Sequence, residues 1–163
     1  MISQERLKEL LDYDPLAGIF VWRVRASNRV KVGDVAGNLS AYGYRLIRID
    51  GRMYMAHRLA WLYMTGTWPD RFVDHKNMVR DDNRWCNLRA ATMSKNKANA
   101  KRPANNTSGF KGVHLLKRAK RYWACITVNG ETKSLGCFST PEAAHRAYMK
   151  AAEQYFGEFA NAG

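Results

Sequence analysis

The chain has 163 residues with 46% apolar and 25% charged side chains, a composition that supports one core or two small ones and argues against disorder. No apolar run approaches the roughly eighteen residues of a membrane span, and MISQERLKELL lacks the basic and apolar regions of a signal peptide, so we expect a soluble cytoplasmic protein. Cys86, Cys125 and Cys137 lie far apart without a C-x-x-C pair, which supports neither a disulfide framework nor a four-ligand zinc site. The formal net charge of +13 exceeds what folding or solubility requires and attracts polyanions.

The N-terminal part of the chain is predicted to hold two helices, a strand and a hairpin. SQERLKELL spaces its leucines as a short amphipathic helix capped by Ser3, and GIFVWRV is typical of a strand. YGYRLIRI and RMYMAH flank Asp50-Gly51, a preferred two-residue hairpin turn. HRLAWLYMTG then predicts a helix that ends at Gly66. We interpret His57, at the start of that helix, as a packed or capping imidazole rather than a ligand.

The stretch VDHKNMVRDDNRWCNLRAATMSKNKAN, residues 73–99, concentrates polar side chains in one supersecondary unit. RFVDH and RWCNL suit two short strands around a polar loop, and TMSKNKANAK suits a helix capped by Thr92 or Ser94. This order of strand, loop, strand and helix is expected to bring Asp74 and His75 opposite Asn96 on the helix.

These residue types suit hydrolysis of a phosphate ester. Carboxylate and amide oxygens, which Asp74 and Asn96 offer, are ligands for a magnesium-like ion, and the imidazole of His75 can take a proton from water near neutral pH. Asn87 has a donor and an acceptor with which it can pin the loop and orient the imidazole. Each residue alone would be interpreted as a turn, cap or surface residue.

Taken together, the spacing of His75, Asn87 and Asn96 resembles the His-Asn-His (HNH) nucleases of the ββα-metal fold, specifically the bacteriophage homing endonucleases. The resemblance covers residues 43–99 and includes AHRLAWLY, the D-H and N-L pairs, and Asn in the helix where other HNH proteins carry His. It implies that His75 is the general base, that Asp74 and Asn96 bind Mg²⁺ or Mn²⁺, and that Asn87 is the structural asparagine. Asn83 competes for that last role, and we prefer Asn87 because N-L leads into the second strand. The resemblance also implies a phage-encoded protein acting in the cytoplasm of a bacterial host.

A second module is predicted after KRPANNTS, where Pro103 ends any preceding helix. RYWACITV places Tyr122, Ala124, Ile126 and Val128 on one face and Arg121, Trp123, Cys125 and Thr127 on the other. Asn129-Gly130 turns the chain into ETKSLGCF, and STPEAAHRAYMKAAEQYFG predicts a helix whose inward stripe is Ala144, Ala147, Tyr148, Ala151 and Tyr155. The expected product is a three-stranded antiparallel sheet packed on one helix.

Double-stranded DNA is the expected partner. Between Lys95 and Arg121 there are nine Lys or Arg and no Asp or Glu, whereas the amphipathic basic helix that favours membrane binding is missing. SGFKGVH, LGCFSTPEAAHRAY and AAEQYFGEFAN resemble the APETALA-type DNA-binding domain of plant ethylene-response factors, in which the exposed sheet face enters the major groove. That resemblance, with the basic run, implies DNA contacts from Lys111, His114, Lys117, Arg118, Lys120, Arg121, Trp123, Thr127 and Lys133.

We therefore predict an α+β protein with a ββα-metal nuclease region in residues 1–100, a linker in 101–107 and a DNA-binding domain in 108–163. The predicted function is a metal-dependent DNA endonuclease of the homing type, in which His75 activates water and one divalent ion stabilises the leaving 3′ oxygen. The alternative is a DNA-binding regulator with a vestigial nuclease motif; an RNA-binding protein is less favoured because no aromatic RNP pattern is present. The oligomeric state is left open. A fragment ending near Lys101 is expected to keep the catalytic unit.

Overall fold

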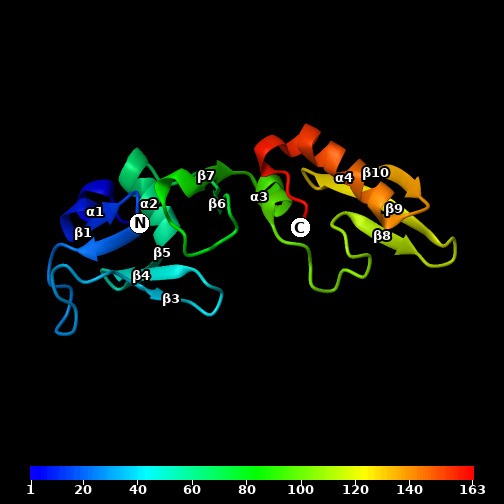
Figure 1. Ribbon diagram of the computed structural model, residues 1–163. Coiled ribbons are helices and arrows are strands. Elements are labelled where there is room, and N and C mark those ends of the chain that lie inside the picture. The colour runs from blue at the N-terminus through cyan, green and yellow to red at the C-terminus, as the bar shows by residue number, and fades with distance from the viewer. The chain divides into compact units, whose positions relative to one another are not determined.

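The computed structural model describes all 163 residues and has the mixed α+β architecture expected from the sequence (Figure 1). In chain order the elements are α1 (Gln4–Leu10), β1 (Leu11–Asp14), β2 (Ile19–Trp22), β3 (Asn38–Leu39), β4 (Arg45–Ile49), β5 (Arg52–Met55), α2 (Ala56–Thr65), β6 (Phe72–His75), η1 (Trp85–Asn87), β7 (Leu88–Ala91), α3 (Met93–Asn99), β8 (Val113–Leu116), β9 (Arg121–Val128), β10 (Glu131–Phe138), α4 (Pro141–Phe156) and η2 (Gly157–Phe159). None of the helices combines the length and the apolar character needed to cross a bilayer.

The chain forms two compact units, residues 1–90 and 91–163. The boundary falls before α3, whereas the sequence placed it after that helix. The reason lies in the contacts of α3, which packs against α4 and η2 of the second unit. The expectation that a fragment ending near Lys101 keeps an intact catalytic unit is therefore not supported, because such a fragment lacks both elements.

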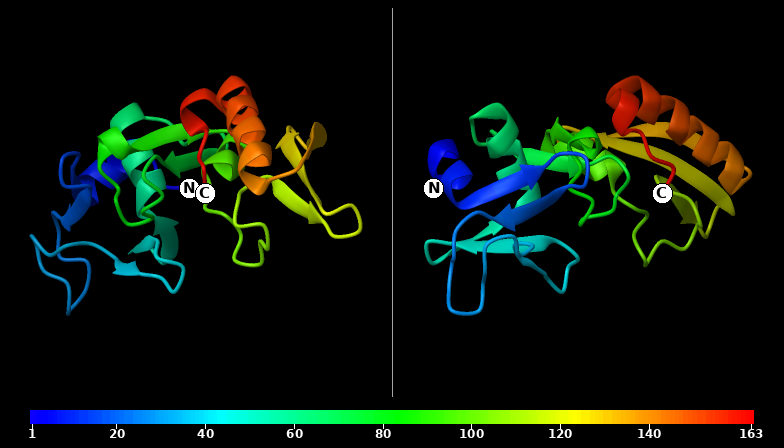
Figure 2. Two further views of the ribbon diagram at one scale, coloured as in Figure 1. Left: turned by 45° about the vertical axis from the view of Figure 1, so that its right-hand side comes forward. Right: turned by 60° about the vertical axis from the view of Figure 1, so that its left-hand side comes forward.

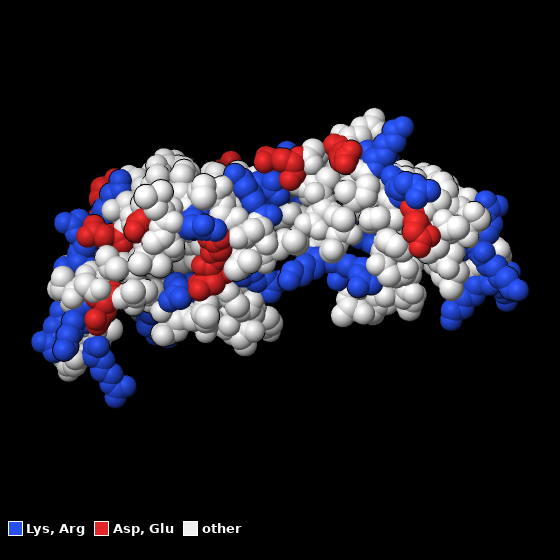
Figure 3. Space-filling view, viewed as in Figure 1, with Lys and Arg blue, Asp and Glu red and all other residues white.

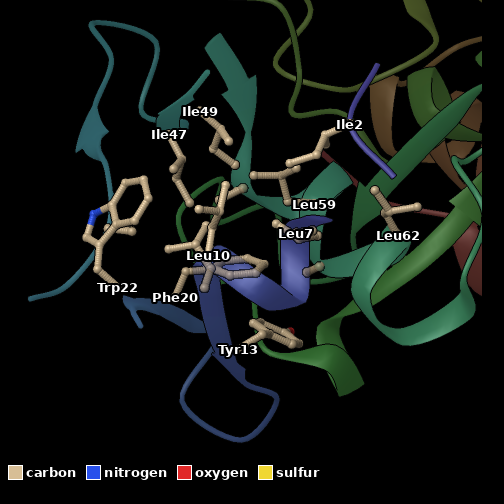
Figure 4. Packing of buried hydrophobic residues seen from close by; sticks show 14 of the residues in the cluster. Ile2, Leu7, Leu10, Tyr13, Phe20, Trp22, Ile47, Ile49, Leu59 and Leu62 are labelled. Atoms are coloured by element: carbon tan, nitrogen blue, oxygen red, sulfur yellow. The ribbon is translucent and has the colours of Figure 1, made fainter. Parts of the chain in front are cut away.

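The core of the first unit joins segments from its whole length. Side chains of α1, the β1–β2 hairpin, β4 and α2 converge in one apolar cluster (Figure 4). Leu7, Phe20, Ile47 and Leu59 are fully buried there. Val73 of β6 and Leu88 of β7 belong to the same cluster, so the β6–β7 sheet is fixed to this core.

Local signals decided the ends of several elements in the first unit. Ser3 caps α1 by accepting from the amide of Arg6, as predicted. Asp50 and Gly51, with φ of 46° and 78°, form the two-residue turn between the paired strands β4 and β5. Gly66 ends α2 in the left-handed region, with φ of 78°, where a side chain would be strained.

The second unit contains the predicted antiparallel sheet, in the order β10-β9-β8, with α4 across one face (Figure 2). Thr140 caps α4, and Asn129-Gly130 forms the β9–β10 turn with both φ angles positive. Gly112 allows the loop before β8 to lie flat on Tyr148 of α4, since a Cβ there would stand 2.0 Å from that ring. Close packing of helix and sheet therefore depends on this glycine.

Two predictions about faces in this unit are wrong. Tyr155 is 40% exposed, and Ala152 and Phe156 are buried in its place beside Ala144, Tyr148 and Ala151. Cys125, predicted on the free face of β9, is only 9% exposed. In both cases the periodicity of a helix or strand was used to predict burial, but burial also depends on which neighbouring elements cover the residue.

Candidate active site

Two of the predicted site residues, Asp74 and His75, lie at the end of β6 in the first unit. Val73, Asp74 and His75 are all buried, although two of the three are ionisable. Strand alternation sends Asp74 to the face opposite Val73 and His75, so both faces of β6 are covered here. Buried charged or titratable groups need partners, and each of the two has one within the first unit.

Asp74 pairs with Arg89 of the neighbouring strand β7. The Nε and Nη2 atoms of Arg89 both lie 3.0 Å from Oδ2 of Asp74, and the two side chains are 10% and 8% exposed. A guanidinium paired with a buried carboxylate holds it in one orientation. Arg89 was not predicted as a site residue from the sequence, where its signal is a single positive charge inside the apolar strand LRAA, directly after N-L.

His75 is oriented by Asn83. Its Nε2 lies 3.1 Å from Oδ1 of Asn83, while Nδ2 of that amide donates to the carbonyl of Asp81 at 3.2 Å. With the amide in this orientation Nε2 carries the proton, and the lone pair of the imidazole is on Nδ1. Burial lowers the pKa of His75 more than the hydrogen bond to Asn83 and the nearby carboxylates raise it, so the ring is neutral at neutral pH.

Aromatic rings surround the other sides of this imidazole. The ring of His57 meets that of His75 edge-on at 5.0 Å between centroids, and Tyr44 lies 5.4 Å from His57 and 6.2 Å from His75. Burial, with a contribution from His75, lowers the pKa of His57 to about 3. The structure thus agrees with the interpretation of His57 as a packed imidazole, and shows that what it packs against is His75.

Asn87 has a different task from Asn83. Its Nδ2 donates to the carbonyl of Asp82 at 2.7 Å and to Oδ1 of Asn77 at 3.0 Å, and its Oδ1 accepts from the amide of Asn77. Its backbone carbonyl accepts from the amide of Lys76. Asn87 therefore closes the β6–β7 loop on itself. Asn87 was predicted both to pin the loop and to orient the imidazole, but the contact with the imidazole is made by Asn83.

The β1–β2 hairpin supports the loop that carries Asn83. The hydroxyl of Tyr13 donates to the carbonyl of Asn83 at 2.6 Å, and the amide of Trp85 donates to the carbonyl of Pro15 at 2.9 Å. Gly18 brings the hairpin turn against this loop, because a Cβ at that position would stand 2.3 Å from the amide nitrogen of Arg84. The orientation of His75 is thus tied to an element far away in the sequence.

Asn96, the fourth predicted site residue, is a half-buried residue of α3 in the second unit. Thr92 caps this helix by accepting from the amide of Lys95 at 3.2 Å, which settles the choice between Thr92 and Ser94. The predicted order of strand, loop, strand and helix is confirmed, but the predicted second strand RWCNL is wrong in its bounds: Trp85–Asn87 form η1, and β7 begins at Leu88. Only one residue, Thr92, separates β7 from α3.

The predicted DNA-contacting residues differ in exposure. His114, Trp123 and Thr127 lie on one face of the sheet: the indole of Trp123 donates to Ser134 at 2.8 Å, and Thr127 bonds Thr132 at 3.0 Å. Trp123 is half-buried, and the exposed members are His114, Lys117, Arg118, Lys120, Arg121, Thr127 and Lys133. In Figure 3, Lys and Arg side chains project from the part of the surface that holds β8, β9 and β10.

Lys111 does not lie on that face. It is 9% exposed, and its Nζ donates to the carbonyls of Ala98 and Ala100 at 2.5 and 2.6 Å. Lys111 was predicted to contact DNA because a lysine in a basic run is usually solvated. The structure gives it backbone acceptors inside the second unit instead.

The donor set fits a hard cation with few protein ligands. Nowhere in the chain do three or more His, Cys, Asp or Glu side chains gather as metal ligands. Mg²⁺ and Mn²⁺ sites on nucleic-acid enzymes commonly use one or two carboxylates and take their remaining oxygens from phosphate and water. Asp74, buried and held by Arg89, suits that pattern.

Comparison with known proteins agrees with this geometry. Residues 54–98, which contain the end of β5, α2, the β6–β7 segment and most of α3, match a family described as HNH endonuclease. The chain is 32% identical over 123 residues to an uncharacterized HNH endonuclease of Acanthamoeba polyphaga mimivirus, a match covering 75% of this chain and 63% of the relative. No solved structure matches the chain. The segment that holds Asp74, His75, Asn83 and Asn87 is thus similar to HNH endonucleases, and this similarity favours a nuclease.

Proposed function

We propose that this protein is a metal-dependent DNA endonuclease of the homing type. The observation that carries the proposal is the buried Asp74–His75 pair at the end of β6, with the imidazole bonded to Asn83 and the carboxylate to Arg89. A regulator that only binds DNA has no need to bury these two groups with separate partners. The similarity of residues 54–98 to HNH endonucleases supports the same assignment.

His75 is the proposed general base. The hydrogen bond from Nε2 to Asn83 leaves Nδ1 as the basic nitrogen, and burial keeps the ring neutral, so it can accept a proton from the attacking water. Asn87 is a positioning residue, because it fixes the loop that carries Asn83 without reaching the imidazole.

Asp74 and Asn96 are the proposed ligands of a Mg²⁺ or Mn²⁺ ion. When bound, such an ion stabilises the charge that develops on the scissile phosphate and the leaving 3′ oxygen. Arg89 holds the buried Asp74 carboxylate in one orientation, and carboxylate oxygens are ligands that a hard cation prefers. Asp74 and Asn96 both lie within the segment 54–98 that is similar to HNH endonucleases, which supports assigning them together.

The second unit is the proposed targeting domain, with an APETALA-like mode of binding double-stranded DNA. It holds 12 Lys or Arg against four Asp or Glu, and its sheet face presents aromatic and hydroxyl side chains between basic turns. Basic side chains around such a face supply phosphate contacts, and Trp123, His114 and Thr127 supply contacts to base edges. A phage origin and action in the bacterial cytoplasm remain predictions.

The test is nicking of supercoiled plasmid DNA by the purified chain in Mg²⁺, with and without EDTA. His75→Ala should lower the rate at least about 10²-fold while leaving DNA affinity nearly unchanged, because general-base catalysis contributes roughly 10² to 10⁴. Binding without any EDTA-sensitive nicking would favour the DNA-binding regulator instead. Near-normal nicking by His75→Ala would remove His75 from the mechanism.

A further inference from the structure

Arg80, in the loop between β6 and β7, carries a positive charge that no carboxylate pairs with. Two acidic residues follow it in the sequence, but each has another partner. Arg45 of β4 bonds both carboxylate oxygens of Asp81, at 3.0 and 3.2 Å, and Arg84 bonds Asp82 at 2.6 Å. Because Arg80 is exposed and forms no ion pair, its charge is available to an anionic ligand.

The guanidinium of Arg80 is nevertheless held in one place. Its Cζ lies 5.0 Å from the centre of the Tyr44 ring, and its Nη1 donates to the carbonyl of Tyr42 at 3.0 Å. Ordering a long side chain costs free energy when a ligand binds, and these two contacts reduce that cost beforehand. Nε and Nη2 have no protein partner, and this edge of a guanidinium can donate to two oxygens of one phosphate.

Tyr44 connects this arginine to the proposed general base. Its ring lies 6.2 Å from that of His75 between centroids. Burial is the main cause of the lowered pKa of His75, and the nearby charge of Arg80 lowers it further. Asp81 supplies a second connection, because its carbonyl accepts from Nδ2 of Asn83, whose Oδ1 bonds His75. The same part of the first unit therefore positions both the guanidinium and the imidazole.

We infer that Arg80 binds the scissile phosphate of the DNA, with Nε and Nη2 donating to its non-bridging oxygens while His75 activates the attacking water. This inference rests on the proposed nuclease function and adds the residue that receives the phosphate in the first unit. The non-bridging oxygens gain negative charge as water attacks phosphorus, so donors already aimed at them stabilise the transition state more than the bound substrate. Loss of the contact should therefore lower kcat more than affinity.

The test compares Arg80→Lys with Arg48→Lys in the full chain. Both variants keep the positive charge and lose the guanidinium, but Arg48 is an exposed residue of β4 outside the proposed site. The first readout is the NMR signal of each arginine's Nε–H group in the wild type, assigned by its loss in the matching variant. It is followed during titration with diethyl phosphate at constant ionic strength, without DNA or metal. The second readout is kcat for plasmid nicking at saturating DNA in Mg²⁺, together with DNA affinity.

The Arg80 signal should shift and saturate with diethyl phosphate, whereas the Arg48 signal should stay in place. Arg80→Lys should lower kcat about 10²-fold, the usual cost of removing one preorganised donor, and should change affinity far less. Arg48→Lys should keep the wild-type kcat. A shifted Arg80 signal with an unchanged kcat would mean that Arg80 binds a flanking phosphate. A lower kcat without any shift would mean that Arg80 only links two loops, and either result overturns the inference.

Failure of the proposed function gives a different result. The wild type would then show no EDTA-sensitive nicking, and the role of Arg80 at a scissile phosphate would fall with the nuclease assignment. The diethyl phosphate titration requires neither metal nor cleavage, so it still shows whether Arg80 binds a phosphodiester.

Discussion

At the scale of one residue, the proposed ligand Asn96 is expected to set the metal preference. An amide oxygen there, with the Asp74 carboxylate, favours hard ions, whereas an imidazole nitrogen favours borderline ions such as zinc or nickel. Asn96→His should shift the ion preference of nicking toward zinc or nickel. Asn96→Ala should raise the Mg²⁺ requirement by more than the roughly tenfold that losing an outer-shell partner costs. Nicking rates of the three proteins against the concentration of each ion measure both effects, and best activity of the wild type with zinc would contradict them.

His57 makes the stability of the first unit dependent on pH. Its pKa of about 3 in the folded chain lies below the 6.5 of an unfolded histidine, so between these values the unfolded state binds more protons. Stability is therefore complete above about pH 6.5 and falls as the pH drops toward 3. At pH 5 this single group should cost about 2 kcal/mol.

His57→Phe keeps a ring beside His75 and Tyr44 but cannot be protonated. The fall in Tm between pH 7.5 and pH 5 should therefore be smaller in the variant than in the wild type. It should not vanish, because burial also lowers the pKa of His75. Equal falls in the two proteins would show that His57 is not held neutral by burial.

The β1–β2 hairpin acts at the scale of an element. Its turn supports the loop of Asn83 through Gly18, and the chain offers a matched control in Gly33. Both glycines have positive φ, 73° and 88°, but only at Gly18 would a Cβ meet backbone, 2.3 Å from the amide nitrogen of Arg84; at Gly33 it would meet nothing within 4 Å.

Gly18→Ala should therefore destabilise the protein by about 1–3 kcal/mol more than Gly33→Ala, the usual range for forced overpacking. It should also reduce nicking, because the displaced loop carries the residue that orients His75. Thermal unfolding and plasmid nicking of the two variants measure this difference. Equal behaviour would mean that the hairpin is not a support for the site.

At the scale of the whole molecule, the position of the basic residues predicts how the affinity for DNA responds to salt. Each phosphate contact adds about 0.9 to the slope of log affinity against log salt concentration. Lys117 and Arg118 are exposed in the β8–β9 turn, and replacing both with Ala should lower the slope by about 1.8. Arg146→Ala with Lys150→Ala removes the same two charges from α4 and should leave the slope unchanged. Fluorescence anisotropy on one duplex over a series of KCl concentrations gives the slopes, and equal slopes would place the DNA elsewhere.

The sequence by itself determined what depends on neighbouring residues. Caps at Ser3, Thr92 and Thr140, the paired turns at Asp50-Gly51 and Asn129-Gly130, and the order of elements through residues 72–99 follow from local hydrogen bonding and backbone preference. The spacing of Asp74, His75, Asn87 and Asn96 was visible for the same reason, because these residues lie within one short stretch.

Only the tertiary structure decided which side chains meet across long separations. In the structure Arg89 pairs with Asp74, and Asn83 and His57 contact His75. Lys111 bonds to the C-terminal end of α3. The sequence shows where each lysine and arginine occurs along the chain. Whether such a side chain is solvated or buried depends on which elements cover it, and therefore on the packing of the whole core. For that reason the boundary between the units falls before α3 rather than after it: the helix is joined to β7 by the chain, yet its stabilising contacts come from residues that follow it.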